Sequence, residues 1–344
     1  MQNTTTGIVF DSVFLKHDQY GHPENSKRLE SIFFELEKKD LLNKVSQLKS
    51  RSAETDEIKI CHAREYIEYV REFCDNGGGY LDPDTYANSY SFNAAVTAVG
   101  SSIDLIETVI RGDLKNGFAL VRPPGHHALS DRSMGFCLFG NIAIAAKSAL
   151  TQPGINKVAI VDFDVHHGNG TQALVGDDPN ILFISTHQYP FYPGTGSIRE
   201  IGNGKAEGTI INIPLQASVG DEVFKIVHKK IVIPALERFQ PDLILVSAGY
   251  DAHWDDPLAN LNLSLTGYDW ISRELINSAE RICSGKIVFF LEGGYNLQVL
   301  SNGVANTIRG LLGMEDFEDP LGKSNNEEPD IERVIKELIK IHHL

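Results

Sequence analysis

Short apolar runs recur along the chain and are the first guide to its fold. Eight of these runs predict β-strands, at residues 7–10, 58–61, 118–121, 158–163, 181–185, 209–213, 243–247 and 286–291. Several are apolar at every position instead of at alternate positions, which is typical of strands buried on both faces of a parallel sheet.

The segments between these runs carry apolar residues at helical spacing. They predict helices over residues 28–42, 65–73, 91–110, 141–150, 222–239 and 267–282. Strands that alternate with helices predict an α/β fold of three layers, with helices flanking a central parallel sheet. No linker or repeat divides the chain, so we expect one domain over residues 1–344. Residues 315–344 then form an acidic loop and a C-terminal helix, packed on this domain or appended to it.

Composition and charge narrow the classes of partner. The 344 residues are 42% hydrophobic, which is enough for a large core, and they carry 31 basic and 46 acidic side chains, a net charge of −15. So acidic a chain is a poor candidate for binding nucleic acid, although a basic protein partner stays open. The sequence carries no information on oligomeric state.

Targeting signals and cysteines point to one setting. Residues 1–6 lack a basic segment leading into an apolar one, and no apolar run approaches the length of a membrane span. The four cysteines are widely scattered and form no C-x-x-C pair, which argues against a disulfide framework and against a cysteine zinc site. We therefore expect a cytoplasmic protein without a membrane partner.

The most informative stretch is residues 160–171, where a buried strand runs into two carboxylates and two imidazoles. Ionised groups without partners are too costly inside a protein, so this cluster needs a reason. Asp164 and His166 are two residues apart and share one face of an extended chain. They supply two ligands of a three-ligand catalytic zinc site. The alternative is a strand end with a satisfied network of ion pairs.

Three further strand ends carry reactive side chains. His126 and His127 follow a Pro-Pro-Gly turn, Asp251 follows the run at 243–247, and Tyr295 follows two glycines after the run at 286–291. Ligands bind outside the carboxyl ends of strands in open α/β sheets, so these groups are expected at one site. Each is weak evidence alone, but together with the cluster at residues 160–171 they indicate a single active site.

The chemistry of this set is that of hydrolysis. Two carboxylates and one imidazole can hold a metal with an open position, and such a metal lowers the pKa of a bound water. His126 and His127 can move protons, and Asp162 can orient an imidazole through a hydrogen bond. Tyr295 can donate a hydrogen bond to a developing oxyanion. The combination predicts cleavage of an amide or a related acyl bond.

Seven motifs in order resemble those of the histone deacetylase family, which includes acetylpolyamine amidohydrolases and bacterial deacetylase-like proteins. They stand at residues 22–28, 122–128, 135–137, 162–171, 192–196, 249–253 and 292–297. The resemblance implies a single α/β domain with a central eight-stranded parallel sheet, similar to that of arginase. The eight candidate strands agree with it in number.

The resemblance also implies a role for individual residues. The expected Zn²⁺ ligands are Asp164, His166 and Asp251. His127 matches the general base and acid, and His126 its electrostatic neighbour, paired with Asp162. Tyr295 matches the tyrosine that polarises the substrate carbonyl.

Further residues are expected around this centre by the same resemblance. Gly135 and Phe136 match positions that line a tunnel for acyl-lysine, and Tyr192 matches its second aromatic wall. Leu258 occupies a gatekeeper position where one polyamine-specific relative carries glutamate. A structural K⁺ is expected near Asp162, Asp164, His166, Ser185 and Thr186.

Asn169 narrows the subgroup, because many members of the family carry an aspartate there as the partner of His127. An asparagine cannot stabilise an imidazolium by charge, so His127 should be less basic here. With the residues around it, Asn169 resembles the class II branch and its bacterial relatives.

The sequence thus predicts a zinc-dependent amidohydrolase that removes an acetyl or another short acyl group from the ε-amino group of lysine in proteins or peptides. The nearest alternative is an acetylpolyamine amidohydrolase with the same chemistry. An arginase-like binuclear hydrolase and a non-catalytic module that binds acyl-lysine are further alternatives. Fe²⁺ could replace Zn²⁺, since nitrogen and oxygen ligands accept both.

Overall fold

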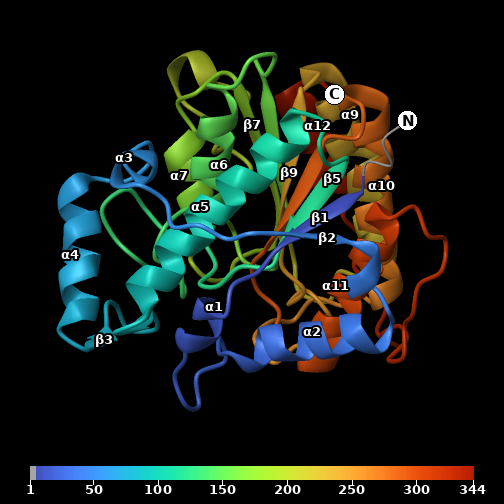
Figure 1. Ribbon diagram of the computed structural model, residues 1–344. Coiled ribbons are helices and arrows are strands. Elements are labelled where there is room, and N and C mark those ends of the chain that lie inside the picture. The colour runs from blue at the N-terminus through green and yellow to red at the C-terminus, as the bar shows by residue number, and fades with distance from the viewer. Residues whose placement is uncertain (1–4) are drawn as a thin grey trace.

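A central sheet of parallel strands organises the molecule. The computed structural model describes residues 5–344 (Figure 1), so the expectation for residues 1–6 falls largely outside it. The strands of the chain are β1 (Thr6–Val9), β2 (Ser46–Leu48), β3 (Gly78–Tyr80), β4 (Tyr86–Asn88), β5 (Asn116–Ala119), β6 (Val158–Asp162), β7 (Ile181–Gln188), β8 (Ile210–Leu215), β9 (Leu243–Ala248) and β10 (Ile287–Leu291).

Eight of these strands form the main sheet, in the order β2-β1-β5-β10-β9-β6-β7-β8, and every neighbouring pair is parallel. The strands β3 and β4 form a separate antiparallel hairpin. The single-domain α/β fold with an eight-stranded parallel sheet is therefore confirmed.

Helices cover both faces of the sheet. They are α1 (Val13–Lys16), α2 (Lys27–Lys38), α3 (Thr55–Ile58), α4 (Arg64–Asp75), α5 (Ser91–Ile110), α6 (Asn141–Ala149), α7 (Asn169–Val175), α8 (Asp221–Val227), η3 (His228–Val232), α9 (Ile233–Phe239), α10 (Leu265–Cys283), α11 (Leu297–Leu311) and α12 (Glu332–His342). Figure 1 shows α5, α6 and α7 on one side of the sheet and α2, α9, α10 and α11 on the other. None of the helices within residues 5–344 is both long and apolar enough to cross a membrane.

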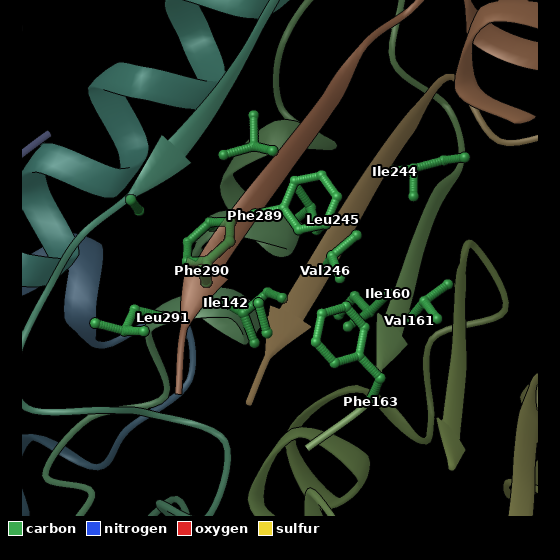
Figure 2. Packing of buried hydrophobic residues seen from close by; sticks show 14 of the residues in the cluster. Ile142, Ile160, Val161, Phe163, Ile244, Leu245, Val246, Phe289, Phe290 and Leu291 are labelled. Atoms are coloured by element: carbon green, nitrogen blue, oxygen red, sulfur yellow. The ribbon is translucent and has the colours of Figure 1, made fainter. Parts of the chain in front are cut away.

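The core explains why the strands were recognisable from their composition. Figure 2 shows side chains of β6, β9 and β10 extending to both sides of the sheet. Ile160, Leu245, Val246, Phe289 and Phe290 are all fully buried. Successive strand residues point to opposite faces, so a strand covered on both faces has to be apolar throughout.

One predicted strand is wrong and one was missed. Residues 58–61 are not a strand, because α3 ends at Ile58 and a turn follows. A capping box between Glu54 and Glu57 starts this helix. The eighth strand is instead β2, a partly exposed edge strand of three residues, Ser46–Leu48. A polar strand this short gives no apolar run to find.

The helices also differ in places. The segment predicted as one helix at 222–239 is helical throughout, but α8 continues through the π-helical turn η3 into α9. The helix α11 was not predicted, although the side chain of Asn296 caps its first turn by accepting hydrogen bonds from the backbone N–H of Gln298 and Val299. The terminal helix α12 buries Ile335 and Leu338. The acidic loop before it is held by ion pairs of Arg309 with Asp316 and Glu318.

Candidate active site

Four neighbouring strands end at one place and carry the predicted residues. In the sheet, β5, β10, β9 and β6 are adjacent. His126 and His127 lie beyond β5, Tyr295 beyond β10, Asp251 just after β9, and Asp164 and His166 just after β6. Because all four strands are parallel, their carboxyl ends meet at one edge of the sheet.

Three of these side chains form a cluster that could hold a metal ion. One ligand atom each from Asp164, His166 and Asp251 lies within 4.8 Å of the other two. The Nδ1 atom of His166 lies 3.2 Å from Oδ1 of Asp164 and 3.4 Å from Oδ2 of Asp251. Asp251 Oδ2 is fully buried and accepts no hydrogen bond within the described part of the chain, although His166 Nδ1, another member of the cluster, lies near it. A buried carboxylate oxygen without a donor is what a bound cation would satisfy.

Backbone amides hold the two carboxylates in place. Asp164 Oδ2 accepts a hydrogen bond from the backbone N–H of Gly293 at 2.8 Å, and Asp251 Oδ1 accepts one from Val165 at 3.0 Å. A Cβ atom at Gly293 would lie 2.0 Å from Asp251 Oδ2. The loop after β10 can approach the cluster this closely only because residue 293 has no side chain.

The two histidines beside the cluster have opposite acid–base character. His126 Nδ1 lies 3.1 Å from Asp162 Oδ2. Burial lowers the pKa of His126, but the charges of Asp164 and Asp162 outweigh this and raise it to about 10. Burial, together with the charges of His126 and His166, holds the pKa of His127 well below its usual value. The pair therefore offers one imidazolium and one neutral imidazole.

The neutral histidine is oriented by an amide. His127 Nδ1 lies 2.7 Å from Oδ1 of Asn169, the first residue of α7. The buried Glu292 stabilises the turn that carries both imidazoles. Its Oε2 accepts hydrogen bonds from the backbone N–H of Gly125 (2.8 Å) and His126 (3.2 Å).

Tyr295 is held through its backbone. Its N–H donates to Asp256 Oδ2 at 2.7 Å, and Asp256 Oδ1 accepts from the N–H of Leu258 at 3.0 Å. The guanidinium of Arg28 lies 5.1 Å from the centre of the tyrosine ring. Burial raises the pKa of Tyr295 well above its usual value, so the hydroxyl stays protonated and can donate a hydrogen bond.

A buried ion-pair network supports this loop. Arg28 donates to the backbone oxygens of Gly294 and Glu292 and also to Glu24 Oε1. Glu24 in turn accepts two hydrogen bonds from Arg122, the residue that follows β5 by three positions. The side chains of Glu24, Arg28 and Arg122 are all completely buried.

A narrow cavity of about 190 Å³ leads to the cluster. The four predicted tunnel residues all line it, and these are Gly135, Phe136, Tyr192 and Leu258. His126, His127, His166 and Tyr295 line it as well. The ring centres of Phe136 and Tyr295 are 5.8 Å apart, and those of Tyr192 and His127 are 5.2 Å apart. The aromatic walls therefore reach down to the reactive groups.

The cavity also includes residues that were not predicted. These are Asp84, Pro124, Phe191 and Gly293. The ring of Phe191 stacks on His166 with centres 5.6 Å apart. Its position next to Tyr192 could have indicated it, whereas nothing in the sequence near Asp84 links that loop to the site.

The residues expected around a potassium ion are adjacent to one another. Thr186 Oγ1 donates to the backbone oxygen of Asp162 at 3.3 Å, and the backbone N–H of Asp164 donates to Asp162 Oδ1 at 3.1 Å. Ser185 Oγ lies 2.9 Å from His187 Nδ1. Potassium binding at this place stays a prediction.

An eight-stranded parallel sheet between helices, with these groups at its carboxyl edge, matches the arginase/deacetylase fold. The chain belongs to the histone deacetylase family, since the family model for the histone deacetylase domain matches residues 22–311. Family membership supports deacetylase activity.

Individual relatives agree with this assignment. The chain is 42% identical over 330 residues to histone deacetylase 14, chloroplastic, of Arabidopsis thaliana, which covers 90% of this chain and 78% of that protein. It is 40% identical over 296 residues to a probable deacetylase of Archaeoglobus fulgidus, and the aligned region covers 85% of this chain and 82% of that protein. A crystal structure of the HDA15 HD domain superposes with a TM-score of 0.90 at 35% identity, over 98% of this chain and 94% of that one.

Proposed function

We propose that this protein is a zinc-dependent deacylase that removes an acetyl or another short acyl group from the ε-amino group of lysine in peptides or proteins. The observation that carries the proposal is the cluster of Asp164, His166 and Asp251, with its buried oxygen that lacks a donor. This cluster faces a neutral histidine and a protonated tyrosine at the end of a narrow cavity.

Two carboxylates and one imidazole suit Zn²⁺, which leaves a coordination position open at such sites. A Zn²⁺ held there would act as a Lewis acid and lower the pKa of water. Fe²⁺ is the second metal that these ligands accept. Three residues of the chain would hold the metal, and the remaining steps fall to their neighbours.

The neighbours supply the proton transfers. His127 directs Nδ1 at Asn169, so Nε2 is its free nitrogen. A neutral Nε2 takes a proton from the attacking water and returns it to the leaving amine. Tyr295 donates its hydroxyl hydrogen to the carbonyl oxygen of the substrate, where negative charge develops. Burial and the charge of His126, which Asp164 and Asp162 keep protonated, together hold the pKa of His127 low.

The shape of the cavity supports an acylated lysine as the substrate. Phe136 and Tyr192 offer apolar walls to the methylene stem of a lysine side chain, and they exclude water from the reacting carbonyl. Leu258 at the same cavity offers no charge to the second amine of a polyamine. Asp84 does, so an acylated polyamine is the competing substrate. A structural K⁺ and a cytoplasmic location stay predictions.

The test is metal analysis combined with a substrate panel. Purified protein should contain about one zinc per chain and should hydrolyse acetyl-lysine peptides faster than acetylputrescine or acetylspermidine. A chelator should remove both metal and activity, and Zn²⁺ should restore them. Asp251→Ala should bind no zinc, whereas Asp75→Ala, at an exposed carboxylate of α4, should behave as the wild type. Protein that stays inert after reconstitution with Zn²⁺ and Fe²⁺ would contradict the proposal.

A further inference from the structure

The side-chain amide of Asn169 has two chemically different ends, and each end faces a different partner. Its Oδ1 lies 2.7 Å from His127 Nδ1. Its Nδ2 donates a hydrogen bond to the thioether sulfur of Met134 at 3.3 Å. Met134 was not among the predicted site residues, and the function proposed above assigns it no role.

The orientation of this amide decides which nitrogen of His127 carries the proton. A neutral imidazole has one N–H and one free lone pair. With Oδ1 toward it, Nδ1 has to carry the hydrogen, and Nε2 is left free to act as a base. If the amide turned over, its NH₂ group would face Nδ1, and the proton would move to Nε2. An aspartate at this position would leave the proton on Nδ1 in either orientation, because both of its oxygens accept hydrogen bonds.

Met134 can favour only one of the two orientations. A thioether sulfur accepts hydrogen bonds weakly and has no hydrogen to donate. With the amide turned over, Oδ1 would face the lone pairs of the sulfur with nothing between them. The present orientation gains an N–H···S contact, and the alternative loses it.

The turn of residues 134–137 fixes the backbone that carries the side chain of Met134. The backbone N–H of Met134 donates to the oxygen of Cys137 at 3.3 Å, and that of Cys137 donates to Met134 at 2.9 Å. Gly135 has φ of +54°, and a Cβ atom there would lie 2.3 Å from Cδ2 of His127. The turn therefore packs directly against the imidazole that Asn169 orients.

We propose that Met134 is a positioning residue, which fixes the tautomer of His127 by holding the amide of Asn169. The inference rests on the proposed function, in which His127 is the base. It links two features of this sequence, since an asparagine at position 169 creates the need for an acceptor that a methionine at position 134 meets.

Kinetics of matched variants test this proposal. Met134→Leu keeps the bulk of the side chain and removes the acceptor, so kcat on an acetyl-lysine peptide should fall on the order of threefold, because a weak hydrogen bond is lost. KM should change little, since Met134 does not line the cavity. Met314→Leu makes the same chemical change shortly after the end of α11 and should have no effect. In an Asn169→Asp background, Met134→Leu should have no further effect, because a carboxylate has no orientation to lose.

A spectroscopic measurement tests the tautomer without relying on activity. In ¹⁵N-histidine spectra of the zinc-loaded protein, the signal lost in His127→Ala should show the Nδ1–H form in the wild type. It should contain an admixture of the Nε2–H form in Met134→Leu. An unchanged tautomer in Met134→Leu would overturn the proposal, and so would an equal loss of kcat in the wild-type and Asn169→Asp backgrounds. If the wild type hydrolysed no acyl-lysine, the proposed function would fail, but the spectra would still decide the role of Met134.

Discussion

Replacing Glu24 with glutamine should destabilise the protein severely, although Glu24 touches none of the proposed catalytic groups. The carboxylate lies between the guanidinium groups of Arg28 and Arg122, and all three side chains are completely buried. A glutamine would remove the negative charge and would place an NH₂ group against a guanidinium donor. Two buried cations would then remain without a counter-charge.

Two physical arguments give the same magnitude. Burial raises the pKa of Glu24, but Arg122 above all lowers it, from 4.5 to about 2. This lowering of the pKa corresponds to about 3 kcal/mol of folding free energy. Breaking a buried ion pair by removing one partner costs about 3–5 kcal/mol in other proteins. We therefore expect Glu24→Gln to lose about 3 kcal/mol or more at neutral pH.

The pH dependence has a definite sign. Because the pKa of Glu24 is lower in the folded state, its contribution is present in full above about pH 4.5 and is lost as the pH falls toward about 2. The difference in unfolding free energy between the wild type and Glu24→Gln should therefore be constant near neutral pH. It should shrink between pH 4.5 and pH 2.

Urea unfolding followed by the fluorescence of Trp254 and Trp270 measures this difference. Glu37→Gln, at an exposed position of α2, is the matched control and should change the free energy by less than about 0.5 kcal/mol. If Glu24→Gln were as stable as Glu37→Gln, or if its deficit were the same at pH 3 as at pH 7, the reasoning about the buried network would be refuted.

Three further predictions concern the site itself. Tyr295→Phe should lower kcat on acetyl-lysine peptides by about a hundredfold or more and leave the metal content unchanged, because only a donor to the carbonyl oxygen is lost; an unaltered rate would reject this role. His127→Ala should abolish turnover while zinc, measured by elemental analysis, stays bound, and loss of the metal instead would mean that His127 is a ligand. Gly293→Ala should reduce zinc affinity, measured by competition with a chromogenic chelator, because the new Cβ would collide with Asp251 Oδ2; wild-type affinity would contradict the geometry described for this loop.

The metal cluster and the histidine pair could be predicted from the sequence because they lie a few residues beyond the ends of apolar strands. Asp164 and His166 are two and four residues beyond the end of β6, and Asp251 is three residues beyond the end of β9. A strand buried on both faces can be recognised from its continuous run of apolar residues, and a polar cluster at the end of such a run is easy to identify. The resemblance to the histone deacetylase family then assigned these residues to one active site and implied a role for each.

The parts that were missed depend on contacts between distant segments. The approach of Asp84 to the cavity depends on a loop near the β3–β4 hairpin that leaves no periodic pattern. The pairing of Glu24 with Arg122 joins residues 98 positions apart. The strand β2 could not be predicted because an exposed edge strand needs no apolar residues. The run at residues 58–61 predicts a strand because it is too short to show a helical period. The capping box between Glu54 and Glu57 instead starts a helix that ends at Ile58.

The place of β10 in the sheet has a consequence for how the enzyme is made. It is the last strand in the sequence, yet it lies between β5 and β9, with Phe289 opposite both Phe118 and Val246. On the ribosome, the groups β2-β1-β5 and β9-β6-β7-β8 emerge first, and no strand of one group pairs with a strand of the other. Gly293 and Tyr295 follow β10 in the sequence, so they emerge only after it. A nascent chain interrupted before residue 287 would therefore lack the strand that pairs with both β5 and β9, and it could form neither the continuous eight-stranded sheet nor the complete site until that strand had been made.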